Sequence, residues 1–247
     1  KKLISVLLAG LLGAAMGGCS GTDGSTASAG EKLQVGIVQI MEHTSLDTIR
    51  ESFLQQMEQL GYGEDKVDYD IQNAQGEQTN LGTICQKFVG DGVDMIVAIA
   101  TPTAQTAAAS TSEIPILFSA VTDPVEAKLL TDPQHPDGNV TGTSDAIPVD
   151  QVMQLCQELT PEVHKIGFMY TTSEINSQVT TEQAMEAAEQ MGYETQLMTI
   201  SEVSELQQAA QSLAQEVDAI YVPIDNTIAQ AMPVLAQVGI DFQIPIY

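Results

Sequence analysis

The chain has few basic residues: 8 Lys or Arg stand against 33 Asp or Glu, which gives a formal net charge of −25 at pH 7. No Lys or Arg follows Lys165. Binding to nucleic acid and peripheral binding to anionic lipid both need a basic surface, so this composition argues against both. An anionic ligand would therefore have to be held by peptide dipoles and hydroxyl groups rather than by side-chain cations.

Catalytic and metal-binding motifs are missing as well. The sequence contains no GxSxG, HExxH, Walker or dinucleotide-binding GxGxxG pattern. Its three histidines are scattered and its three cysteines show no CxxC spacing, so we expect no metal and no cofactor. Cys85 and Cys156 fall in stretches with helical periodicity, where we expect two free core thiols; a disulfide between them is the alternative.

The first 18 residues have the pattern of a targeting segment rather than of a folded domain. Two lysines precede an apolar run from Leu3 to Met16, which ends at Gly17-Gly18-Cys19. This run is too short to span a bilayer as a helix, so we expect cleavage before Cys19 and attachment of lipid to it. An ordinary secretory peptide with a chance cysteine is the alternative. Residues 19–30 are rich in Ser, Gly, Thr and Ala, which predicts a flexible linker.

From residue 31 onward, short apolar runs alternate with amphipathic stretches. Buried β-branched runs separated by helices are typical of parallel sheets built from βαβ units, so we expect an α/β fold. The expected strands are residues 33–40, 67–73, 95–100, 116–119, 165–170, 194–199, 219–223 and 244–247. The expected helices are residues 45–60, 78–91, 103–110, 151–158, 177–191, 201–215 and 227–238.

Two such series occur, and the segment between them does not alternate. Residues 132–150 carry three prolines and two glycines, with an extended run at 139–147. We interpret this segment as the crossover between two Rossmann-like lobes, 31–147 and 148–247, with Pro148 near a hinge. A single domain with a long insertion is the alternative. Residues 244–247 look like a strand without its following helix, so we expect the second lobe to be incomplete at its C-terminus.

The loops expected after the strands contain hydroxyls, amides and single acids, but no basic side chain. In open parallel sheets, ligands bind beyond the carboxyl ends of the strands. Thr101-Pro102-Thr103 opens a helix whose first amides suit a carboxylate, and residues 170–177 offer a second set of amides. Asp123 and Asp225 each follow a strand and suit an ammonium group. Helix or turn capping is the alternative role for each residue, but together they suit a zwitterion such as an amino acid.

Six segments of the chain, in order between about Leu33 and Tyr247, resemble one protein family. They are VGIVQIMEHTSLDTIRESFLQQMEQLGY, AIATPTAQ, AVTDPVEAKL, NVTGTSD, YTTSEINS and VPIDNT. The family is that of the ABC transporter substrate-binding proteins of the tryptophan/tyrosine-binding type. The resemblance implies a periplasmic-binding-protein fold of type I, with two lobes that close on a ligand. It also implies ligand contacts from Gln39, Glu42, Thr101, Thr103, Asp123, Ser144, Tyr170, Ser173, Asn176, Ser177, Asp225 and Asn226.

The expected function is that of an extracytoplasmic solute-binding lipoprotein of an ABC importer. We expect a monomer, anchored through Cys19, that passes a zwitterionic solute to the transmembrane subunits of a permease. The resemblance implies an aromatic amino acid, yet the chain has no Trp, and Tyr170 is the obvious stacking candidate in these loops. A sensing module read by a surface receptor is one alternative. An extracellular enzyme is another, with Glu42 and His43 as its acid/base pair.

Overall fold

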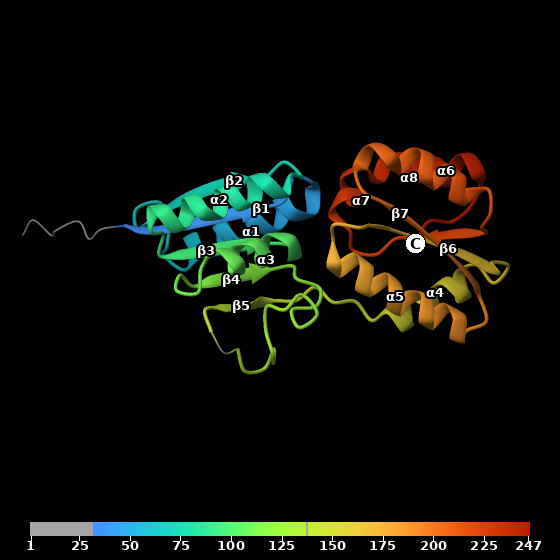
Figure 1. Cartoon of the computed structure of the whole chain (residues 1–247), viewed down its shortest axis with the longest axis horizontal. Helices are drawn as coiled ribbons and strands as arrows, with labels where there is room; N and C mark the ends of the chain where they lie inside the picture. Colours follow the sequence, from blue (N-terminus) through green and yellow to red (C-terminus); the bar gives the residue numbers. More distant parts are fainter. Residues whose placement is uncertain (1–31, 137) are drawn as a thin grey trace, which may run out of the picture. The chain divides into compact units, whose positions relative to one another are not determined.

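The structure is a computed structural model that describes residues 32–136 and 138–247; Figure 1 shows it coloured along the sequence. The expected targeting segment, the linker and Cys19 lie outside the described residues. Within the described ranges, no helix is long and apolar enough to cross a membrane. The same residues contain no group of three His, Cys, Asp or Glu side chains that could hold a metal ion.

A parallel sheet of five strands forms the N-terminal half. Its strands are β1 (Leu33–Gln39), β2 (Val67–Asn73), β3 (Met95–Ile99), β4 (Ile116–Ser119) and β5 (Val140–Thr143), in the order β2-β1-β3-β4-β5. The connecting helices are α1 (Thr44–Gln59), α2 (Gln78–Asp91) and α3 (Thr101–Ser110). All strand pairs in this sheet are parallel, which confirms the predicted fold class.

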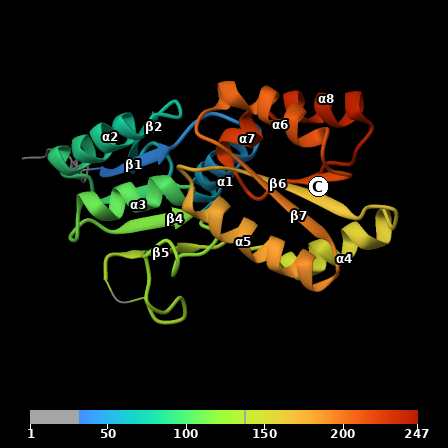
Figure 2. The ribbon, with the colours of Figure 1, turned by 45° about the vertical axis from the view of Figure 1, so that its right-hand side comes forward.

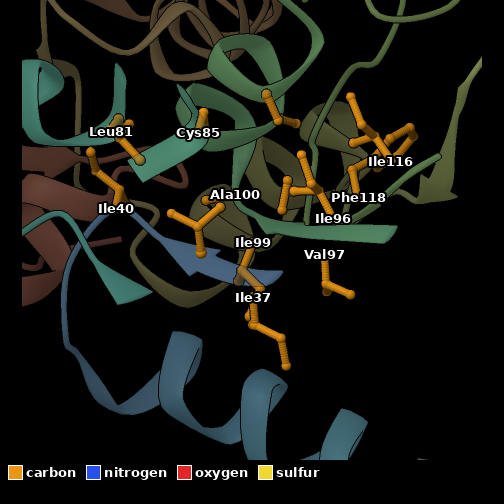
Figure 3. Packing of buried hydrophobic residues seen from close by; sticks show 14 of the residues in the cluster. Ile37, Ile40, Leu81, Cys85, Ile96, Val97, Ile99, Ala100, Ile116 and Phe118 are labelled. Atoms are coloured by element: carbon orange, nitrogen blue, oxygen red, sulfur yellow. The ribbon is translucent and has the colours of Figure 1, made fainter. Parts of the chain in front are cut away.

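Apolar side chains fill both faces of this first sheet. Figure 3 shows Ile37 and Val97 on the face toward α1, while Cys85 of α2 lies on the opposite face. On that opposite face the approach is close: a Cβ added to Gly36 would lie 2.7 Å from the ring of Phe88. Only glycine therefore lets α2 pack against β1 at this distance.

The predicted free core thiols are confirmed. Cys85 and Cys156 are both buried and carry no disulfide. Burial raises the pKa of each thiol to about 11. The thiolate is the reactive form of cysteine, so both side chains behave as small apolar groups at neutral pH.

The C-terminal half contains a second parallel sheet, of three strands. Its elements are α4 (Val149–Leu159), β6 (Lys165–Thr171), α5 (Ile175–Gln190), β7 (Glu194–Ile200), α6 (Leu206–Ala214), β8 (Ala219–Tyr221), α7 (Asn226–Gln230) and α8 (Met232–Phe242), with a short 3-10 helix at Val203–Glu205. The strand order is β7-β6-β8. Helices α4 and α5 pack together on one face of this sheet, and α6 and α8 pack together on the other (Figures 1 and 2).

Successive residues of β6 point to opposite faces of the second sheet, as the pleat of a strand requires. Phe168 packs against Tyr221, with 5.5 Å between the ring centroids, in the cluster that includes residues of α4 and α5. The next residue, Met169, belongs to the cluster that includes residues of α6 and α8. The second sheet is thus covered on both faces, as expected for a parallel sheet.

Some expected elements differ from the observed ones. The helix expected at 227–238 is split between α7 and α8, because Pro233 lacks an N–H and its ring clashes with the preceding turn. The first residues of the helix expected at 201–215 form the 3-10 helix. Residues 244–247 do not form a full strand; Ile246 makes a single parallel bridge to Ile220. The extended run at 139–147 contains β5, which joins the first sheet. The lobe boundary between 147 and 148 stays a prediction.

Candidate functional site

A cavity of about 150 Å³ lies among the loops and first helical turns that follow the strands of both sheets. The segments that line it follow β1, β3, β4 and β5 of the first sheet, and β6 and β8 of the second. Ligands of open parallel sheets bind at this edge. The lining residues are His43, Ser45, Leu46, Ile49, Ala100, Thr101, Ala120, Thr122, Asp145, Asn176, Pro223, Ile224, Asp225, Asn226, Ile228, Ala229 and Met232.

Two alanines of the lining adopt left-handed backbone conformations. Ala100 has φ 79° at the end of β3, and Ala120 has φ 56° after β4. Such a conformation costs a residue other than glycine on the order of 1 kcal/mol, and strain of this kind gathers at functional sites. The turn at Ala100 lets α3 begin directly at Thr101, and no side chain caps this helix. The positive end of the α3 dipole therefore lies at the cavity.

Four buried polar atoms in the lining have no hydrogen-bond partner among the described residues. They are Thr101 Oγ1, Thr122 Oγ1, Asp145 Oδ1 and Asn176 Oδ1. A buried polar atom without a partner is costly, so their gathering in one cavity indicates that a ligand or water completes them. Burial also raises the pKa of the Asp145 carboxyl. The Thr122 hydroxyl lies near enough to lower this pKa in part, but the two side chains do not meet the geometry of a hydrogen bond.

The Asp225 carboxylate, also in the lining, is satisfied within the C-terminal half. Its Oδ2 accepts a hydrogen bond from Thr171 N at 2.7 Å. Its Oδ1 accepts from Thr171 Oγ1 and from Ile228 N, both at 2.9 Å. The last contact caps the first turn of α7. Asp225 thus joins the end of β6 to the start of α7.

Glu174 is not part of the cavity lining, but its side chain makes hydrogen bonds to the start of α7. Its side chain is buried, and its Oε2 accepts from Asn226 N at 3.1 Å and from Asn226 Nδ2 at 2.5 Å. Its Oε1 accepts from Thr227 N at 3.1 Å and from Thr227 Oγ1 at 3.2 Å. Burial, followed by the charge of Asp225, raises the pKa of Glu174 to about 7.

One hydrogen bond joins the loops that follow β1 and β8. Asn226 Oδ1 lies 3.3 Å from His43 Nε2, and both residues line the cavity. Because Asn226 Nδ2 is held by Glu174, its oxygen is the end that faces His43. The histidine nitrogen must therefore be the donor in this contact. Glu42, the other member of the expected acid/base pair, is exposed and does not line the cavity.

The unpartnered polar atoms and the larger apolar side chains of the cavity lining come from different segments of the chain. The four polar atoms without partners follow β3, β4, β5 and β6. The apolar side chains come from elements after β1 and β8: Leu46 and Ile49 lie on α1, Ile228 on α7 and Met232 on α8. A ligand that carries both polar groups and an apolar group matches this lining.

Four of the twelve predicted ligand residues line the cavity: Thr101, Asn176, Asp225 and Asn226. Thr103 is buried on the first turn of α3, and its hydroxyl has no hydrogen-bond partner among the described residues. The role of these residues in ligand binding stays a prediction.

The structure does not bring the other predicted residues into the lining. Asp123 Oδ1 accepts from Val125 N at 2.9 Å and Glu126 N at 3.0 Å, so this carboxylate caps its own turn. Three of the remaining six make hydrogen bonds inside one half of the chain: Gln39 with Arg50, Ser144 with Thr122 O, and Ser177 with Ile224 O. The other three are outside the lining; Glu42 and Ser173 are exposed and Tyr170 is half-buried.

Sequence reasoning did not single out Thr122, Asp145 or Glu174. Asp145 follows β5, and the segment that contains it was interpreted as a crossover rather than as a strand with a site-forming loop. Counting 140–143 as a parallel strand of the first sheet would have placed Asp145 at the ligand-binding edge. Glu174 stands in a loop that was predicted to offer amides, but its partners lie more than 50 residues further along the chain.

Two parallel α/β sheets whose strand-end loops share a cavity with buried, unpartnered polar atoms define a protein that binds a small solute. The chain belongs to the family of ABC transporter substrate binding proteins, whose family model matches residues 34–247. This is a family of extracytoplasmic solute-binding proteins and not a family of enzymes.

Several relatives within the family are similar over most of the chain. A tyrosine-binding protein of Clostridioides difficile (strain R20291) is 42% identical over 255 residues, which cover 100% of this chain and 74% of the relative. A solved ABC domain from Streptococcus pneumonia in complex with L-Trp is 36% identical, with a TM-score of 0.85 over 88% of this chain and 74% of that one. A conserved domain protein from Vibrio cholerae is 37% identical, with a TM-score of 0.85 over 87% and 73%.

Proposed function

We propose that the chain captures a zwitterionic amino acid with an apolar, aromatic side chain and delivers it to the transmembrane subunits of an ABC permease. The observation that carries the proposal is the cavity lining, which combines apolar side chains with four buried polar atoms that have no partner among the described residues. The relatives support it, because one is a tyrosine-binding protein and another holds L-Trp.

The unpartnered polar atoms of the lining offer partners for both charges of an amino acid. An ammonium group has three donors, and Asp145 Oδ1 and Asn176 Oδ1 are free acceptors. An ammonium beside Asp145 would also compensate the carboxylate, whose pKa burial now raises. The ligand carboxylate would be held by the hydroxyls of Thr101 and Thr122 and by the uncapped start of α3.

This assignment replaces the two aspartates that the sequence suggested for the ammonium. Both oxygens of Asp225 accept hydrogen bonds from the protein itself, and Asp123 caps its own turn. Asp145 is the carboxylate in the lining whose Oδ1 still lacks a partner. The apolar side chains of the lining, among them Ile49, Ile228 and Met232, would contact the ligand side chain and remove it from water.

The test is calorimetric titration of L-tryptophan and L-tyrosine into the wild type and Asp145→Asn. We expect the variant to bind more weakly by about 2 kcal/mol, roughly 30-fold, because a buried ammonium loses its charged partner. Asp123→Asn is the matched control and should keep the wild-type affinity. The proposal fails if the wild type binds neither amino acid, or if Asp145→Asn binds as tightly as the wild type.

We further propose that the protein acts as a monomer without catalytic turnover, held at the outer face of the membrane by lipid on Cys19. The pattern of residues 1–19 supports this anchor. Expressed with its whole leader, a Cys19→Ala variant should move from the membrane fraction to the medium or periplasm, as followed by fractionation and immunoblotting. Retention of the variant at the membrane would contradict the anchor without affecting the proposed ligand.

A further inference from the structure

We propose that Glu174 is a positioning residue of the binding site: its carboxylate fixes the orientation of the Asn226 carboxamide and so determines which end of it faces His43 across the cavity. The inference rests on the proposed function, because it assigns a role in ligand binding to a residue outside the cavity lining. The inference is drawn from two consecutive contacts. Asn226 Nδ2 lies 2.5 Å from Glu174 Oε2, and Asn226 Oδ1 lies 3.3 Å from His43 Nε2.

The two ends of a carboxamide have opposite hydrogen-bonding roles. A carboxylate only accepts, so Glu174 admits the NH2 end of Asn226 and turns the oxygen toward His43. Asn226 N donates to the same carboxylate oxygen at 3.1 Å, which fixes the backbone beside the side chain. A neutral group at position 174 both donates and accepts, so either end of Asn226 could then face it. His43 would lose the acceptor that fixes its Nε2 as a donor.

The position of Glu174 in the fold excludes the common role of a residue at a helix start. Glu174 is the N-cap of α5, but its side chain makes no capping hydrogen bond to that helix. The carboxylate instead serves the first two residues of α7 with both of its oxygens. The third residue of α7, Ile228, instead donates its backbone N–H to the carboxylate of Asp225. Two buried carboxylates therefore meet at one short helix.

Burial and a charged neighbour let the Glu174 carboxylate take up a proton near neutral pH. Burial and the Asp225 carboxylate together raise the pKa of Glu174 to about 7. The further titratable groups in the cavity lining are His43 and Asp145. Helix α3, which packs on α5, carries none. The other elements that pack on α5 carry Asp150, Cys156 and Glu158 on α4, Lys165 and Tyr170 on β6, and Glu194 on β7. Lowering the pH therefore protonates Glu174, and the orientation of the Asn226 carboxamide is then no longer fixed.

The first experiment measures the affinity for L-tryptophan and L-tyrosine at pH 8, 7 and 6 by calorimetry. We expect the wild-type affinity to fall about tenfold from pH 8 to pH 6, as one proton taken up near pH 7 predicts. Glu174→Gln, which resembles the protonated acid, should bind at pH 8 at least as weakly as the wild type does at pH 6 and should change little with pH. Glu158→Gln, an exposed change on α4, is the matched control and should follow the wild type.

A second variant separates Glu174 from the histidine that it positions. His43→Gln removes the titrating ring but keeps a side-chain N–H donor, so the fall in affinity between pH 8 and pH 6 should persist in it. The proposal is overturned if Glu174→Gln keeps the wild-type pH dependence, or if His43→Gln abolishes it.

A ligand-free measurement keeps this inference distinct from the proposed function. The side-chain amide protons of Asn226, assigned in NMR spectra by their loss in Asn226→Asp, should shift between pH 8 and pH 6 in the wild type. They should stay fixed in Glu174→Gln. Amide signals that do not move in the wild type would overturn the role of Glu174, whereas failure of the wild type to bind either amino acid would overturn the proposed function alone.

Discussion

The two halves of the chain repeat one βαβ arrangement but hold their buried polar groups in different ways. The three strands β2-β1-β3 correspond in order to β7-β6-β8. The helix after the central strand has 16 residues in both halves, and it stops before a glycine with positive φ, Gly61 at 84° and Gly192 at 91°. The backbone thus follows the same path in both halves, and the difference lies in the side chains near the end of the central strand.

In the N-terminal half, the acid near the end of the central strand is Asp47, and the cation of Arg50 compensates its charge. Gln39, the last residue of β1, accepts from Arg50 Nη1 at 2.9 Å and donates to Asp47 Oδ1 at 3.0 Å. Arg50 also pairs with Asp47 at 3.0 Å. The carboxylate of this half is therefore paired with a full positive charge.

In the C-terminal half, helix amides replace the cation, since no Lys or Arg follows Lys165. Asp225 and Glu174 are both about 97% buried, each only 3% exposed, and their partners are N–H and hydroxyl groups of Thr171 and the start of α7. Amides satisfy the hydrogen bonds but leave two negative charges close together. The comparison teaches that the C-terminal half holds two buried carboxylates without a cation, so that it depends on the protonation state of Glu174 and on the position of α7.

The largest expected effect comes from a comparison of two alanine variants, Asp225→Ala in the C-terminal half and Asp47→Ala in the N-terminal half. Asp225→Ala leaves Thr171 N and Ile228 N without acceptors in a buried place, so we expect a loss of about 3 kcal/mol of unfolding free energy. Asp47→Ala should cost about 1 kcal/mol or less, because its ion pair is partly exposed. Urea denaturation of both variants measures the difference. Equal losses in the two variants would show that the halves are stabilised alike.

The repeated fold could be predicted from sequence because its signals are local. Apolar runs of strand length, helical periodicity and the glycines at 61 and 192 all act within a few residues, and the expected strands at 67–73 and 116–119 have the observed bounds. Pro233, which divides α7 from α8, is equally local and was overlooked. The buried state of Cys85 and Cys156 also followed from periodicity.

The site was less predictable because it depends on contacts between distant residues. That Asp145 reaches the cavity follows from the pairing of β5 with β4, which the composition of residues 132–150 does not reveal. That Asp123 caps its own turn could be foreseen only as one of two roles for an Asp before Pro. Glu174 shows the limit most clearly, since its four partners are all on α7 and nothing near it in sequence indicates them.

A smaller effect than that of Asp225→Ala is expected in how the stability of the two halves responds to pH. The pKa of Glu174 is about 7 in the folded chain, above its ordinary value of 4.5. Between these values the folded state holds more protons than the unfolded state, so the contribution of this group is fully present below pH 4.5 and is lost as pH rises through 7. The wild type should therefore lose stability relative to Glu174→Gln by at most about 1.4 kcal/mol per pH unit between pH 5 and 7.

Urea denaturation at pH 5, 6, 7 and 8 gives this difference, with Asp47→Asn as the counterpart in the N-terminal half. The Asp47→Asn difference gives the baseline for a partly exposed ion pair. The sign is informative, since acid strengthens the fold through Glu174 while the positioning role makes acid weaken ligand binding. If stability and affinity instead fell together toward pH 5, partial unfolding of the C-terminal half would explain both, and the contrast between cation and amide compensation would lose its basis.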